Sequence, residues 1–108
     1  MGGVREPNVI DLVTYDAATG EYALIMIEER PWTDSPEQLA QLSEKINNYA
    51  MFALDEGLLR AYPQSAGHPV RIQLDCTGVP TPRAQEYLDL TTGRLGDYRI
   101  RFVVNLLG

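Results

Sequence analysis

The sequence predicts an α+β domain, a two-layer fold with a mixed four-stranded sheet and two helices on one face, in the order β-β-α-β-α-β. Residues 35–62 have the apolar periodicity of a long amphipathic helix. Segments rich in β-branched and aromatic residues flank it, and residues 70–75 and 98–104 alternate between apolar and polar. Because strand, helix and strand follow one another twice, we expect right-handed parallel crossovers, both helices on one face, and strand order 1-2-3-4.

Residues 9–15 and 21–27 are predicted to form a β-hairpin. The connection between them begins with Asp16 and ends with Gly20, which suits a tight turn closed by a residue at positive φ. Both alternating sets of side chains in 21–27 are apolar. We therefore expect this second strand to be covered on both faces.

The long helix has a clear start. Ser35 and Gln38 stand three residues apart with Pro36 between them, which is the pattern of an N-cap, a first-turn proline and a reciprocal capping box. Its apolar stripe consists of Leu39, Leu42, Ile46, Tyr49, Ala50 and Ala53.

The end of this helix has two interpretations. Either it ends near Glu56 with Gly57 as a left-handed cap, or it runs to Ala61 with Gly57 allowing close backbone contact. Packing easily offsets the cost of about 1 kcal/mol of an interior glycine, so the longer helix is the prediction. Pro63 stops it in either case.

The second half supplies a loop, two strands and a helix. Residues 64–69 form the loop, and 70–75 form the strand with the cleanest alternation. Thr81 is predicted to cap the second helix, with Gly93 just past its end. Residues 98–104 are the last strand.

Length and composition bound the organisation. The 108 residues suffice for one core, so we expect a mobile lead-in over residues 1–8 and a single domain over 9–108. Cys76 is the only cysteine, which suits a reducing, cytoplasmic compartment. The longest aliphatic run, 23–27, is far shorter than the about 20 residues of a membrane-spanning helix, and the first residues lack the apolar core of a signal peptide. We expect neither membrane insertion nor export.

The charge balance argues against nucleic acid as a partner. Nine Lys and Arg face fifteen Asp and Glu, a net charge of −6 that repels phosphate backbones. Arg71, Arg99 and Arg101 would nevertheless share one sheet face if the last two strands are neighbours, and such a patch binds carboxylates or phosphates bidentately. Two other interpretations compete: a solvated face, and pairing with the chain's own acidic residues.

The segment from Cys76 to Arg83 is the most suggestive for chemistry. A thiol at a strand end, followed by Thr77, a glycine and an arginine at a helix start, is an arrangement that binds anions and lowers a thiol pKa. Cysteine phosphatases need five residues between Cys and Arg, whereas six stand here, two of them prolines without an amide donor. We therefore expect a structural, buried Cys76 and retain an anion-binding turn or small enzyme as an alternative.

No cofactor or metal site is predicted. His68 is the only histidine, and no second His or Cys stands at ligand spacing from it. Neither GxGxxG nor a Walker lysine is present. The carboxylate pairs Glu28-Glu29 and Asp55-Glu56 are expected to be solvated surface charge, because adjacent side chains point to different sides.

Trp32 follows Pro31 in the linker before the long helix, flanked by charged residues. An indole in such a place suits an interface hot spot. The competing interpretation is that Trp32 folds back as a plug at the helix start, because indole rings are usually largely buried.

Several stretches resemble a family of small bacterial proteins that is known only as a domain of unknown function. The residues that carry the resemblance are 10–12, 24–32, Leu42 with 45–49, and Tyr62-Pro63 with Gly67 and Pro69. They cover about the first 75 residues. The resemblance implies no reaction, ligand or catalytic residue.

These observations favour a non-enzymatic protein-interaction module that forms a homodimer. With both helices on one face, the other face of the sheet is left bare, and a bare apolar face on a small domain requires a partner. The contact surface is expected to be this helix-free face or the region of Trp32. The alternatives are the Cys76-to-Arg83 turn as a ligand site and the arginine face as a site for nucleic acid or an acidic partner.

Overall fold

The structure, a computed structural model, describes residues 10–33 and 35–107. Its elements are β1 (Leu12–Asp16), β2 (Glu21–Glu28), α1 (Pro36–Leu54), α2 (Gly57–Ala61), the short 3-10 helix η1 (Pro63–Ser65), β3 (Val70–Cys76), α3 (Pro82–Gly96) and β4 (Ile100–Leu106). The predicted lead-in over residues 1–8 lies outside the described residues.

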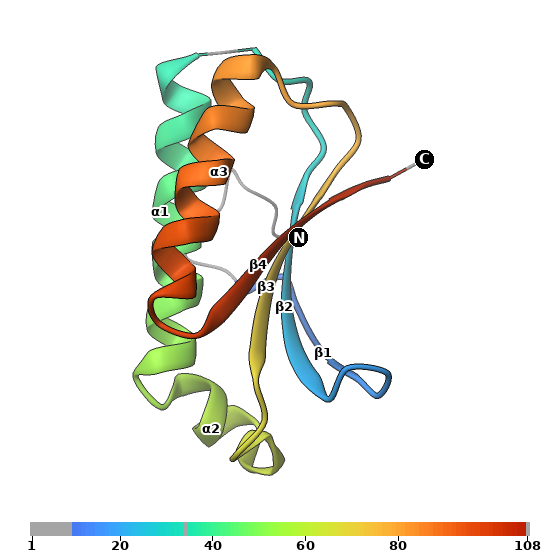
Figure 1. Cartoon of the computed structure of the whole chain (residues 1–108), viewed down its shortest axis with the longest axis vertical. Coiled ribbons are helices and arrows are strands. Elements are labelled where there is room, and N and C mark those ends of the chain that lie inside the picture. Colours follow the sequence, from blue (N-terminus) through green and yellow to red (C-terminus); the bar gives the residue numbers. More distant parts are fainter. Residues whose placement is uncertain (1–9, 34, 108) are drawn as a thin grey trace.

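The sheet has the strand order β1-β2-β3-β4. β1 and β2 pair antiparallel, and β2 with β3 and β3 with β4 pair parallel. Figure 1 shows α1 and α3 side by side on one face of this sheet, with α2 near its lower end. The predicted two-layer α+β fold, strand order and common helix face are therefore confirmed.

The core lies between the helices and the sheet. Its fully buried aliphatic side chains come from α1, α3 and the two central strands: Leu42, Ile46, Leu88, Leu24, Met26, Ile72 and Leu74. β2 contributes to both faces, because seven of its eight residues are buried. This agrees with the expectation from its two apolar sets.

The predicted start of α1 is confirmed, with one difference. Ser35 Oγ accepts a hydrogen bond from Gln38 N at 3.1 Å, and Pro36 occupies the first turn. The Gln38 side chain reaches further back than a capping box does. Its Oε1 accepts from Thr33 N at 3.0 Å, and its Nε2 donates to the carbonyl of Pro31 at 3.1 Å. Gln38 therefore ties the preceding linker to the helix.

The prediction of one helix reaching Ala61 is wrong. α1 ends at Leu54, Glu56 takes a left-handed conformation with φ 66°, and a separate α2 begins at Gly57. A Cβ at Gly57 would lie 2.6 Å from Cδ1 of Phe52, so this residue permits the close backbone approach that follows the turn. The left-handed residue is Glu56 and not the glycine after it.

Two boundaries in the second half also differ from the prediction. α3 continues through Gly93 to Gly96, which brings Leu95 into the core, and that burial offsets the cost of an interior glycine. β4 begins at Ile100, because Tyr98 N and Arg99 N donate to the carbonyls of Leu95 and Gly96 in a tight turn. Within the described residues, no helix combines the length and apolarity that crossing a membrane requires.

Candidate functional site

The face of the sheet opposite α1 and α3, called the helix-free face, is defined by the strand register. Residues that pair across the strands point to the same side. The helix-free face consists of Leu12, Thr14 and Asp16 of β1, Glu21, Ala23, Ile25 and Ile27 of β2, Arg71, Gln73 and Asp75 of β3, and Arg101, Val103 and Asn105 of β4.

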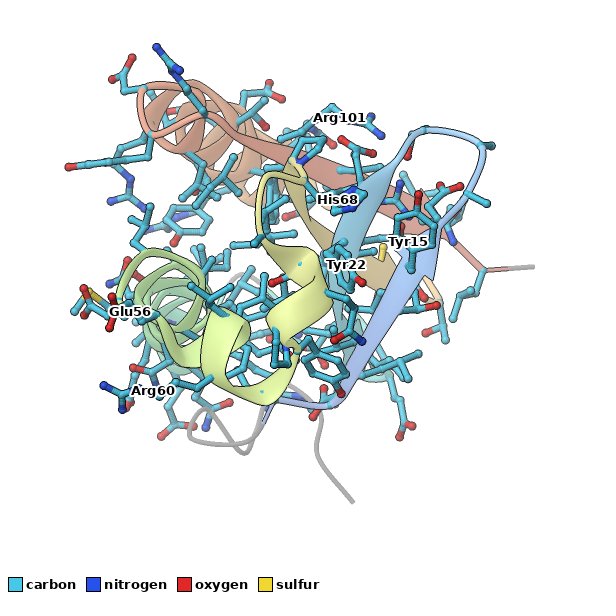
Figure 2. All side chains as sticks on the ribbon, turned by 90° about the horizontal axis from the view of Figure 1, so that it is seen from below. Tyr15, Tyr22, Glu56, Arg60, His68 and Arg101 are labelled. Carbon is cyan, nitrogen blue, oxygen red and sulfur yellow. The ribbon has the colours of Figure 1, made fainter. Side chains whose placement is uncertain are left out.

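One end of this face carries an ion cluster of four residues, Asp16, Glu21, Arg71 and Arg101. Arg71 Nη1 lies 2.9 Å from both Asp16 Oδ2 and Glu21 Oε1. Arg101 donates to the same glutamate twice, from Nε to Oε2 at 2.9 Å and from Nη2 to Oε1 at 2.7 Å. Figure 2 shows Arg101 beside the hairpin that supplies both carboxylates.

The cluster shifts the titration of both acids. Hydrogen bonds from Arg101 and then Arg71 outweigh the effect of burial and lower the pKa of Glu21 to about 2. The hydrogen bond from Arg71 and that from the backbone of Ala18 lower the pKa of Asp16. Both carboxylates are therefore ionised at neutral pH, and two acids balance two arginines.

The predicted arginine patch is divided by the structure. Arg71 and Arg101 are register neighbours on β3 and β4, as expected for adjacent strands. Their guanidiniums bind Glu21, which matches the interpretation that they pair with the chain's own acidic residues. Arg99 precedes β4 with φ 61° and is not on the face.

The middle of the helix-free face is apolar but less bare than its sequence suggests. Ala23 and Ile25 are buried within the chain, and Ile27 and Val103 are half-buried. Leu12 is 51% exposed at the β1 edge. At the far end, Gln73 and Asn105 both donate to Asp75 Oδ1, at 2.8 and 3.1 Å. The face is thus an aliphatic strip between two hydrogen-bonded polar ends.

Trp32 lies as a plug beside the start of α1. Its ring is half-buried against the core, and its Nε1 donates to the carbonyl of Gly78 at 3.1 Å. The indole thus joins the segment after β2 to the loop after β3. Because its donor is used inside the chain, Trp32 offers less to a partner than the helix-free face does.

The three residues of the predicted anion turn do not converge. Cys76 is fully buried, and burial raises the pKa of its thiol, which opposes thiolate chemistry. Thr77 Oγ1 donates to the carbonyl of Glu29 at 3.2 Å. Arg83 is exposed on the first turn of α3, where Thr81 Oγ1 already accepts from Ala84 N as the helix cap.

A buried polar cluster of Asp11, Lys45 and Tyr49 is absent from the predicted site residues. Lys45 is fully buried, with Nζ 3.0 Å from Asp11 Oδ1. Tyr49 Oη accepts from Asp11 N at 2.8 Å and donates to the carbonyl of Ile25 at 3.0 Å, and burial raises the pKa of Tyr49. A signal existed, because Lys45 and Tyr49 fall at the helical spacing of Leu42 and Ile46 on the apolar stripe.

Glu28 corrects another expectation. It was predicted to be solvated, but it is buried at the end of β2, on the face that carries Leu24 and Met26. Burial opposes its ionisation, yet hydrogen bonds from Arg30 prevail and lower the pKa of Glu28. Arg30 donates from Nε and Nη2 to the two carboxylate oxygens at 2.9 and 2.8 Å, and its Nη1 reaches Gln41 Oε1 at 2.9 Å.

His68 lies on the exposed loop before β3. Figure 2 shows His68 near Tyr15 and Tyr22. The ring centroids lie 5.4 Å from Tyr15 and 5.5 Å from Tyr22, and His68 Nδ1 lies 3.0 Å from the carbonyl of Gly20. Among the described residues, no group of three His, Cys, Asp or Glu side chains is arranged to hold a metal ion.

Comparison with known proteins identifies a family and no activity. No characterised protein and no solved structure shows significant similarity to this chain. The model of one family matches residues 2–108, a longer stretch than the resemblance noted from the first 75 residues. The chain belongs to the Family of unknown function (DUF6572).

Proposed function

We propose that this protein is a non-enzymatic interaction module that self-associates through its helix-free face. The observation that carries the proposal is an aliphatic strip on this face beside an ion cluster whose charges cancel. Leu12, Ile27 and Val103 contribute the accessible part of the strip.

Charge favours a second copy as the partner. A two-fold contact brings the same patch of both chains together, so any net charge on the patch would repel itself. The two carboxylates and two guanidiniums of the ion cluster cancel, although the whole chain carries −6. With Asp75 at its far end, the helix-free face carries a net charge of about −1, far less than that of the whole chain, so two copies can meet there without strong repulsion.

The same cluster weakens the case for nucleic acid. Arg71 and Arg101 are held by Glu21, so binding a phosphate backbone would require breaking hydrogen bonds of 2.7 to 2.9 Å. The single thiol Cys76 supports a reducing, cytoplasmic location as part of the proposal.

The test is the mass in solution. Light scattering at micromolar concentration is expected to give twice the mass of one chain for the wild type. The changes Leu12→Glu and Val103→Glu place carboxylates on the helix-free face and are expected to give monomers. Leu90→Glu is the matched control, because Leu90 is 69% exposed on α3 in the helix layer.

Circular dichroism of each variant distinguishes loss of association from loss of fold. A monomeric wild type at this concentration would refute the proposal. Dimers that persist in both face variants but dissociate in Leu90→Glu would place the contact on the helix layer and would equally refute it.

A further inference from the structure

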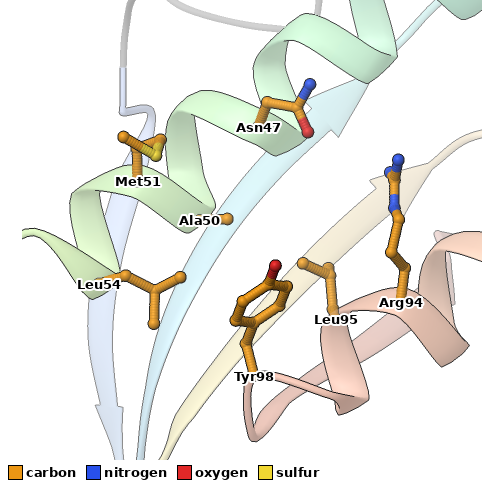
Figure 3. A pocket seen from close by; sticks show the side chains of 7 residues that line it. All are labelled: Asn47, Ala50, Met51, Leu54, Arg94, Leu95 and Tyr98. Carbon is orange, nitrogen blue, oxygen red and sulfur yellow. The ribbon is translucent and has the colours of Figure 1, made fainter.

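The helix layer carries an apolar groove that self-association through the other face does not use. It lies between the C-terminal halves of α1 and α3, as Figure 3 shows. Its volume is about 380 Å³. Its lining residues are Asn47, Ala50, Met51, Leu54, Arg94, Leu95 and Tyr98.

A second hollow extends this groove toward β3 and β4. It has a volume of about 460 Å³, shares Leu54 and Tyr98 with the first hollow, and is also lined by His68 and Arg99. The two hollows together are called the helix groove. Arg94 lies on its first part and Arg99 on its second part, with apolar side chains between them.

The walls of the helix groove are unusually exposed for large apolar side chains. Met51 is 56%, Leu54 47% and Tyr98 60% exposed, and all three line the same hollow. Large apolar side chains gathered at one exposed place typically mark a contact site. Because these walls are half open, the groove does not enclose a small molecule in the way that ligand pockets do, but it suits a peptide that lies along it.

The charge of the helix groove is opposite to that of the chain. Neither hollow is lined by Asp or Glu, whereas both contain an arginine and the second also contains His68. Among the described residues, Arg94 and Arg99 take part in no ion pair, unlike Arg71 and Arg101. In a chain with a net charge of −6, this groove is a place where a negatively charged partner is favoured.

The backbone at Arg99 supports a role for its side chain. Its φ of 61° is left-handed, a conformation that glycine and asparagine adopt at lower cost than arginine. The turn that imposes it is held by hydrogen bonds of 3.0 Å from Tyr98 N and Arg99 N to the end of α3. A guanidinium therefore lines the groove at a position where glycine would be less strained.

We propose that the helix groove docks an acidic amphipathic segment of another protein. The apolar side chains of that segment would contact Met51, Leu54 and Tyr98, and its carboxylates would bind Arg94 and Arg99. The proposal does not depend on self-association, because no residue of the helix-free face lines either hollow.

The test begins with selection of a displayed random peptide library on the full chain. The expected result is enrichment of peptides with apolar residues at helical spacing and flanking Asp or Glu. The affinity of a synthetic, fluorescein-labelled copy of the most enriched peptide is then measured by anisotropy.

The variants separate charge from fold. Arg94→Glu and Arg99→Glu are each expected to weaken binding at least tenfold. Arg60→Glu is the matched control, because Arg60 is exposed on α2 and lines neither hollow, and its affinity should stay within twofold. Arg99→Gly should weaken binding without lowering the midpoint of thermal unfolding.

Three results would overturn the proposal. The first is enrichment of peptides without acidic residues, and the second is an affinity that neither charge reversal changes. The third is failure to enrich any acidic apolar peptide while dodecanoate, a free fatty carboxylate, binds the wild type and not Arg99→Glu.

Discussion

Removing the Glu21 carboxylate tests the ion cluster most directly. Glu21→Gln keeps the size of the side chain but leaves Arg101 without its acid partner and leaves Arg71 with Asp16 alone. Because Glu21 is buried and accepts from both arginines, the free energy of unfolding should fall at neutral pH.

The magnitude follows from the pKa. The pKa of Glu21 falls from 4.5 to about 2 on folding, and a difference of about 2.5 pH units corresponds to at most about 3.4 kcal/mol in the free energy of unfolding. The side chain of Arg101 is 54% exposed, so solvent screening reduces this figure. We expect Glu21→Gln to cost about 2 kcal/mol at pH 7.

The dependence on pH has a definite sign. The pKa of Glu21 is lower in the folded state than in the unfolded state, so its stabilisation is complete above about pH 4.5 and is lost as the pH falls toward 2. Urea unfolding of wild type and variant at pH 7, 4.5 and 2.5 measures the difference. We expect the difference to shrink to less than about 1 kcal/mol at pH 2.5.

The control is Glu86→Gln, which changes an exposed glutamate of α3 that makes no ion pair among the described residues. The free energy of unfolding of this control variant should stay within about 0.5 kcal/mol of the wild-type value. A cost of Glu21→Gln that is the same at pH 7 and pH 2.5 would refute the reasoning, because the loss would then come from packing and not from ionisation.

Three further predictions concern stability and reactivity. Lys45→Met removes the cation that lies beside the buried Asp11 carboxylate, so chemical denaturation should show a free energy of unfolding that is lower by about 3 to 5 kcal/mol. Adding Asp11→Asn to the same chain should restore a large part of this stability. A loss below about 1 kcal/mol would contradict a stabilising role of the buried pair. Gly57→Ala places a Cβ 2.6 Å from Phe52 Cδ1, so we expect the free energy of unfolding, measured by chemical denaturation, to fall by about 1 to 3 kcal/mol. An unchanged free energy of unfolding would show that the Phe52 ring moves aside freely. Native Cys76 should react with a disulfide reagent at least about 100-fold more slowly than in denaturant, because it is fully buried; equal rates would indicate an open site.

The layers of the fold follow from local signals in the sequence. Ser35 and Pro36 fix where α1 begins, and the alternation in 70–75 gives the two faces of β3. The order of elements then leaves few topologies, since parallel crossovers are right-handed. Helix ends are less predictable. A glycine is the residue expected at a left-handed position, but here Glu56 is left-handed, and Gly57 instead allows the close approach of the backbone to Phe52.

The candidate surfaces are predictable only where side-chain direction suffices. Alternation placed Arg71 and Arg101 on one face, but their shared partner Glu21 lies 50 and 80 residues away in sequence, and no local rule selects it among fifteen acidic residues. The helix groove depends on how the turn at Arg99 delays β4, and an arginine gives no sequence signal for the left-handed conformation on which that turn depends. Lys45 has the helical spacing of the apolar stripe and is buried, but a charged residue at such a position is ordinarily predicted to be exposed.

The hydrogen bond between Trp32 and Gly78 gives the molecule a natural optical reporter. Trp32 is the sole tryptophan, and its indole spans the gap between the segment leaving β2 and the loop leaving β3. Any event that separates these two connections would expose the indole ring to water and shift its fluorescence emission to longer wavelengths. Unlabelled protein can therefore show whether a ligand or a second chain loosens this end of the sheet.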